Sequence, residues 1–130
     1  MNGSTISITN VVVKNATVEG GNVGVGTLVG HIQGATSKSN VTIEKAVVLN
    51  SKVSSLSNAI GGVVGDIESS KLTLKDVLVD VTVETTGERV GALVGEARRN
   101  GSSQDLPELF VDGAVTYANL TGLRYLGGVV

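Results

Sequence analysis

The feature that most constrains this chain is a short glycine motif that recurs along it. Each full copy has a glycine at both ends and two aliphatic residues before the closing glycine. The copies are Gly26-Thr27-Leu28-Val29-Gly30, Gly61-Gly62-Val63-Val64-Gly65, Gly91-Ala92-Leu93-Val94-Gly95 and a shortened Gly127-Gly128-Val129-Val130. The motif returns every 30 to 36 residues. Such a period is typical of a protein built from stacked copies of one structural unit.

A second aliphatic pattern precedes each glycine motif and keeps the same register in all four copies. It reads Ile6-Ser7-Ile8, Val41-Thr42-Ile43, Leu72-Thr73-Leu74 and Leu109-Phe110-Val111. Its period of two and the polar turn residues between copies predict strands rather than helices. One repeat is too small to bury its own apolar side, so the copies are expected to stack around a shared core.

We therefore predict an all-β protein, a right-handed parallel β-solenoid (β-helix) of about four three-sided coils. Parallel crossovers are nearly always right-handed. The repeats cover approximately residues 4–37, 38–70, 71–103 and 104–130 of a single domain spanning 1–130, and the strands of the second repeat are expected at 41–46, 47–53 and 59–67. Aromatic residues make up only 2% of the chain, so aliphatic residues must fill the core. The glycines expected at structural turns are Gly26, Gly30, Gly61, Gly65, Gly91, Gly95 and Gly127.

The shared register also predicts which side chains point inward. Two columns should stack in the core, namely Ile8, Ile43, Leu74 and Val111, and Leu28, Val63, Leu93 and Val129. The second aliphatic residue of each motif leaves two alternatives. Simple alternation along a strand would turn Val29, Val64, Val94 and Val130 outward, as a ridge that meets a neighbouring segment of the parent protein or another copy of the chain. A bend at the glycines would instead turn both aliphatics inward.

Charged residues fall into columns with alternating sign. The columns run Thr9, Glu44, Lys75, Asp112 and Asn10, Lys45, Asp76, Gly113. We expect them to form pairs across adjacent coils that fix the coil register, each contributing from a few tenths to about 1 kcal/mol.

One possible metal site follows from the same stacking. His31, Asp66 and Glu96 each follow the closing glycine of a motif, so they should lie in one column. An imidazole and two carboxylates are plausible ligands of a divalent ion. Solvated turn residues explain them more simply, so no metal and no cofactor are predicted.

Composition excludes several classes of function. The net charge of −2 and the isoelectric point near 5.3 offer no basic patch for nucleic acid. The chain has no run of 18 apolar residues, which argues against membrane insertion. With one His, no Cys and no recognisable group of paired carboxylates or of nucleophile and base, an enzyme is not expected.

The repeated Gly-x-(Leu/Val)-Val-Gly motif resembles the GLUG repeat of bacterial surface proteins, which occurs in adhesin-like proteins and in non-catalytic regions of some immunoglobulin A-cleaving metallopeptidases. The resemblance covers essentially the whole chain. It implies a non-catalytic scaffold at the cell surface or outside the cell, acting as a stalk or adhesive surface for a host or glycan ligand that the sequence does not identify. The alternative is a carbohydrate-binding or polysaccharide-lyase-type β-helix.

The end of the sequence adds two further expectations. The last motif lacks its closing glycine, and natural solenoids usually cap or cover their ends. We therefore expect a fragment of a longer protein, with a deliberately trimmed or redesigned repeat array as the other interpretation.

Overall fold

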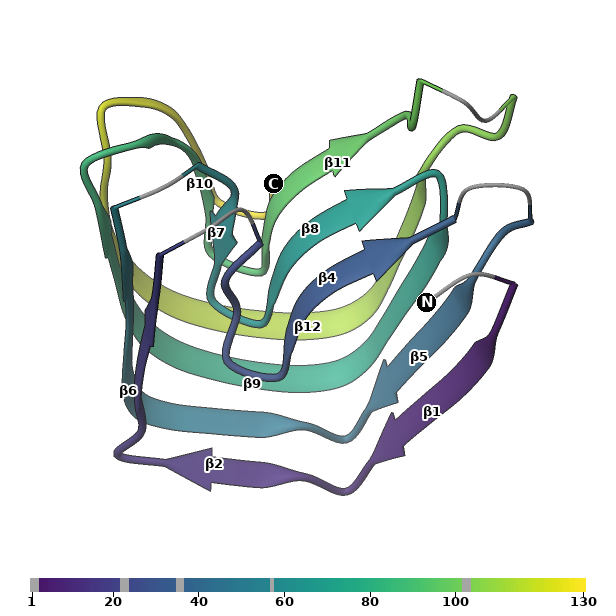
Figure 1. Ribbon diagram of the computed structural model, residues 1–130. Helices are drawn as coiled ribbons and strands as arrows, with labels where there is room; N and C mark the ends of the chain where they lie inside the picture. Colours follow the sequence, from purple (N-terminus) through teal and green to yellow (C-terminus); the bar gives the residue numbers. More distant parts are fainter. Residues whose placement is uncertain (1–2, 22–23, 35–36, 57, 102–103) are drawn as a thin grey trace.

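The computed structural model of the protein describes residues 3–21, 24–34, 37–56, 58–101 and 104–130. Within these residues all the regular secondary structure is β-strand, and every strand pairing is parallel. Figure 1 shows the strands stacked in successive layers from the N-terminus upward. The predicted all-β parallel β-solenoid is confirmed.

Each coil of the solenoid contains several strands. The first coil has β1 (Thr5–Thr9), β2 (Val12–Lys14), β3 (Thr17–Gly20) and β4 (Val29–Gln33), and the second has β5 (Asn40–Glu44), β6 (Val47–Ser55), β7 (Ile60–Gly61) and β8 (Val64–Glu68). The third has β9 (Lys71–Thr85), β10 (Glu88–Gly91) and β11 (Val94–Arg98), and β12 (Glu108–Thr121) and β13 (Arg124–Gly127) begin a fourth. The stack therefore holds three complete coils and a partial fourth, and its two longest strands are β9 and β12.

The strands form three sheets. The largest has the order β1-β5-β9-β6-β2, with β12 paired to β9 and β3 paired to β6. The two smaller sheets have the orders β13-β10-β7 and β11-β8-β4. In Figure 1 the chain passes down β7, turns sharply and rises through β8, so that the small sheets form the two arms of a V. Both β7 and β10 contact β9 of the largest sheet.

The expected inward column on the largest sheet is confirmed. Ile8, Ile43, Leu74 and Val111 are direct partners in successive coils. Ile43 and Leu74 are fully buried, whereas Val111 in the last coil is 40% exposed. The same side chain position is therefore buried in the middle of the stack and open at its end, because each coil is covered by its neighbours.

The two charge columns behave differently. The register of the first column is confirmed, since Thr9, Glu44, Lys75 and Asp112 are direct partners in successive coils. Its expected charge pairing is confirmed for Glu44 and Lys75, with 3.6 Å between Oε1 and Nζ, whereas Lys75 and Asp112, both among the described residues, are strand partners without an ion pair between them. The second column is not a row of strand partners. Its members have left-handed backbones, with φ of 57° at Asn10, 54° at Lys45, 51° at Asp76 and 71° at Gly113. Such a backbone bends the largest sheet at a corner.

The glycine motif forms the bend at the bottom of the V. A Cβ atom on Gly91 would lie 1.7 Å from the carbonyl oxygen of Val94, and one on Gly95 would lie 2.4 Å from the amide nitrogen of Ile60 in the previous coil. Only glycine fits where backbones approach this closely. The prediction of one continuous strand at 59–67 is therefore wrong, since the bend divides this segment into β7 and β8.

The bend also decides between the two alternatives for the motif aliphatics. Val63 and Val64 are 1% and 0% exposed, and Leu93 and Val94 are both fully buried. The outward ridge of Val29, Val64, Val94 and Val130 is therefore wrong. Val29 is half-buried and packs against the core, and Val130 is exposed in the partial last coil. The chain turns between the arms, so strand alternation does not hold across the motif.

Candidate functional site

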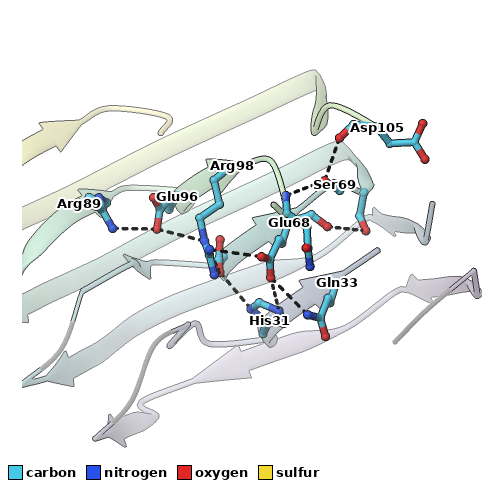
Figure 2. A network of polar contacts seen from close by, with 11 residues as sticks. His31, Gln33, Glu68, Ser69, Arg89, Glu96, Arg98 and Asp105 are labelled. Carbon is cyan, nitrogen blue, oxygen red and sulfur yellow. Dashed lines mark hydrogen bonds and ion pairs between the residues drawn. The ribbon is translucent and has the colours of Figure 1, made fainter. Parts of the chain in front are cut away.

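The strongest group of polar side chains lies on the sheet of β4, β8 and β11. Ile32 and Ile67 of this sheet are fully buried in the core, and alternation along each strand turns the flanking residues to the opposite side. Two columns result, His31, Asp66 and Glu96, and then Gln33, Glu68 and Arg98. Figure 2 shows His31, Gln33, Glu68, Glu96 and Arg98 of these columns converging from three consecutive coils.

The imidazole of His31 lies between two carboxylates of the next coil. Its Nδ1 is 3.0 Å from Oδ2 of Asp66, and its Nε2 is 3.4 Å from Oε2 of Glu68. Nε2 of Gln33 donates a long hydrogen bond of 3.5 Å to the same Glu68 oxygen. The first coil therefore contacts the second through both columns.

Arg98 occupies the centre of the group from the third coil. Its Nε and Nη2 donate to Oδ2 of Asp66 at 3.3 and 3.2 Å, and its Nη1 lies 3.2 Å from Oε1 of Glu68. Oε2 of Glu96 lies 3.7 Å from Arg98 Nε and accepts a hydrogen bond of 3.2 Å from Arg89 on β10. The ion pairs therefore link β8, β10 and β11.

The carboxylates raise the pKa of the Arg98 guanidinium. Burial alone lowers that pKa, but the charges of Asp66, Glu68 and Glu96 and the hydrogen bonds to Asp66 outweigh burial and leave it above its ordinary value. The guanidinium is thus a permanent positive charge. Removing it would leave Asp66, whose side chain is fully buried, without its main counter-ion.

The group has some of the geometry of a metal site. Ligand atoms of His31, Asp66 and Glu68 all lie within 4.8 Å of one another, and such a set suits zinc or a related ion. Oδ1 of Asp66 is buried without a hydrogen-bond partner in the described residues. However, Arg98 already binds the other Asp66 oxygen and Oε1 of Glu68, so an ion would compete with the guanidinium for the charge of these two carboxylates.

The sequence predicted part of this group. His31 and Asp66 come together as expected, and Glu96 lies in their column but pairs with the arginines. Glu68 and Arg98 were missed, although strand alternation places them on the same face, two residues after Asp66 and Glu96. The signal was present in Gly65-Asp66-Ile67-Glu68 and Gly95-Glu96-Ala97-Arg98.

A shallow groove of about 310 Å³ lies beside the ion pairs. Its walls include the Arg89 and Glu96 pair, together with Tyr125, Leu126 and Val130 of the last coil. It combines an aromatic ring that is 66% exposed with a guanidinium and a carboxylate, which together can bind polar ligands that have an apolar face.

Comparisons with protein-family models, with curated proteins and with solved structures found no match for this chain. Across the described ranges, no helix has both the length and the apolar character needed to span a membrane.

Proposed function

We propose that the chain is a non-catalytic repeat scaffold of an exported bacterial cell-surface protein, where it serves as a stalk or adhesive surface. The observation that carries this proposal is the continuity of the stack. Every coil pairs with the next through parallel strands and through shared core columns. The length of such a structure is set by the number of coils, at about 4.8 Å per coil, which suits a spacer.

The charged group on β4, β8 and β11 supports a structural role. Its carboxylates are engaged by His31 and Arg98 from the adjacent coils and by Arg89 within the third coil, rather than left available to a substrate. Buried charges are costly unless they are paired and hydrogen-bonded. Their role in this proposal is to hold three coils in register.

The spacer function is tested by lengthening the stack. Inserting additional copies of residues 38–70 should lengthen the particle by about 4.8 Å per copy, measured as the maximum dimension in small-angle X-ray scattering. An insertion that widens the particle without lengthening it would contradict the proposal.

The location is tested on intact cells. Antibodies against the purified chain should label intact bacteria that carry the gene, and protease added outside the cells should remove the label. Labelling that requires permeabilised cells would contradict an exported scaffold.

Carbohydrate binding is the second candidate, and the groove beside Arg89 and Tyr125 favours it. Aromatic rings and paired charges are suited to the apolar faces and hydroxyl groups of sugars. A panel of neutral and acidic oligosaccharides should then show binding that Tyr125→Ala removes and that Tyr117→Ala, on another face, retains. Equal binding by both variants would reject this candidate.

A further inference from the structure

One outward-facing column of the largest sheet is aliphatic in every coil. It consists of Val12, Val47, Leu78 and Val115, which are direct partners in successive coils. Val12 and Val115 are 60% and 52% exposed. Two residues further along the strands, Leu49 and Tyr117 add apolar surface in the second and fourth coils, whereas Lys14 and Asp80 occupy this position in the first and third. The three valines and Leu78, together with Leu49 and Tyr117, are called the aliphatic patch.

The other outward columns of this sheet are mainly polar. One contains Ser7, Thr42, Thr73 and Phe110, a second contains Thr17, Lys52, Thr82 and Asn119, and a third contains Glu19, Ser54, Glu84 and Thr121. The aliphatic patch is therefore not a general property of the solenoid face. Contiguous exposed apolar surface usually marks a contact site.

Charges beside the aliphatic patch indicate its partner. Lys45 in the second coil and Asp76 in the third lie two residues before Val47 and Leu78, and both are exposed at the corner of the sheet. Two chains can pack face to face about a two-fold axis that runs parallel to the strands, between the second and third coils. Rotation about this axis reverses the order of the coils in one chain relative to the other. It brings Lys45 of each chain opposite Asp76 of the other, and Val47 opposite Leu78.

The other face-to-face arrangement is unfavourable. A two-fold axis parallel to the solenoid axis keeps each coil opposite its own copy. It would bring Asp76 opposite Asp80, which is also exposed and lies two residues beyond Leu78. Like charges placed opposite one another are destabilising, so the charge pattern selects the reversed arrangement.

We propose that the aliphatic patch is the interface of a homodimer in which two chains pack face to face with reversed coil order. The patch spans four strands, about 14 Å along the stack, and only a few residues along each strand. Its area is therefore well below the roughly 800 Å² per partner of a standard interface. The dimer is therefore weak, with a dissociation constant of roughly 0.1 mM. This inference does not depend on the proposed surface location.

Sedimentation equilibrium between about 10 µM and 1 mM tests the dimer, a range that brackets the expected affinity. K45D and D76K should each weaken dimerisation about tenfold, because each variant places like charges at two contacts. Mixing the two variants in equal amounts should restore dimerisation. In the mixed dimer alone, one chain supplies carboxylates at both positions and the other supplies amines, so that both contacts join opposite charges.

Glu19→Lys is the matched control, since it changes the net charge by the same amount as D76K on an exposed position outside the aliphatic patch. Dimerisation should be unchanged in this variant. A double replacement, V47T with L78T, should weaken dimerisation about tenfold without altering the charge.

Circular dichroism melts establish that each variant is folded. A wild-type chain that stays monomeric at 1 mM overturns the proposal, and so does a mixture of K45D and D76K that associates no better than either variant alone. Association that survives V47T with L78T would place the contact elsewhere, such as the open ends of the stack, and would also overturn it.

Discussion

The backbone at Gly61 approaches the carbonyl oxygen of Val64 so closely that a Cβ atom on Gly61 would lie 1.9 Å from that oxygen. No real Cβ atom tolerates this distance. Glycine is required at this position because of the close contact within the bend. It is not required by the backbone conformation, since Gly61 does not have a positive φ. The bend in turn directs both Val63 and Val64 into the core.

Gly61→Ala should lower the free energy of unfolding by about 3 kcal/mol, because the new methyl group must displace backbone atoms in a packed core. Gly128→Ala is the matched control. It lies one position later in the last copy of the motif, where a Cβ atom would meet no atom within 4 Å, and Ala92 already occupies this position in the third coil. Chemical denaturation measures both changes. A Gly61→Ala chain as stable as Gly128→Ala would show that the bend relaxes freely.

The fold could be predicted because the repeat carries its own register. Ile43 and Leu74 recur at one place in their repeats, and any stacking of coils brings them together. The inward direction of Val64 could not be predicted in the same way. Alternation holds within a strand, whereas the path of the chain between two glycines depends on a close contact that residue types do not specify.

The candidate site was predictable in outline for the same reason. Stacking alone brings His31 to Asp66. The contacts of Arg98 depend on the conformation of a long side chain that extends from the third coil to Asp66 and Glu68 of the second. Neither composition nor spacing determines that conformation. The sequence shows that Val12, Val47, Leu78 and Val115 recur at one position of the repeat. Whether their side chains point inward or outward depends on where the strand bends at the corner, and residue types alone do not specify that position.

Leu74→Ala should lower the free energy of unfolding by about 3 kcal/mol, since Leu74 is fully buried and its loss leaves a cavity. Val111 belongs to the same column but is 40% exposed in the last coil, so Val111→Ala should cost about 1 kcal/mol or less. Urea denaturation monitored by circular dichroism compares them. Equal losses would mean that the last coil is as well covered as the middle of the stack.

Glu108 should titrate at an unusually low pH. A hydrogen bond from Lys38 is the main cause that lowers the pKa of this carboxyl below its ordinary value near 4.5, and the charge of Lys71 makes a smaller contribution. A lowered pKa in the folded state means that this pair stabilises the fold fully above pH 4.5. The stabilisation is lost as the pH falls through the lowered value.

Titration of the Glu108 carboxyl carbon by nuclear magnetic resonance tests this assignment. Lys38→Met should raise the pKa of Glu108 toward its ordinary value, and Lys71→Met should raise it less. A larger effect from Lys71→Met would show that the charge of Lys71, rather than the hydrogen bond from Lys38, controls the carboxyl.

Arg98→Met should destabilise the protein because it removes the positive charge that three carboxylates share. The side chain of Asp66 is fully buried and receives two hydrogen bonds from Arg98. Breaking one partner of a buried pair costs about 3–5 kcal/mol. Since Arg98 itself is 40% exposed, solvent screening reduces the expected loss to about 2 kcal/mol.

Arg99→Met is the matched control, because Arg99 is the next residue and is exposed; its replacement should change the free energy of unfolding by less than about 0.5 kcal/mol. Adding Asp66→Asn to Arg98→Met should recover part of the loss, since the double variant no longer buries an unpaired charge. Thermal and urea unfolding of the wild type, Arg98→Met, Asp66→Asn and the double variant form a double-mutant cycle. Losses that simply add would show that Asp66 and Arg98 act independently, and the ion pairs would then not be what holds the three coils in register.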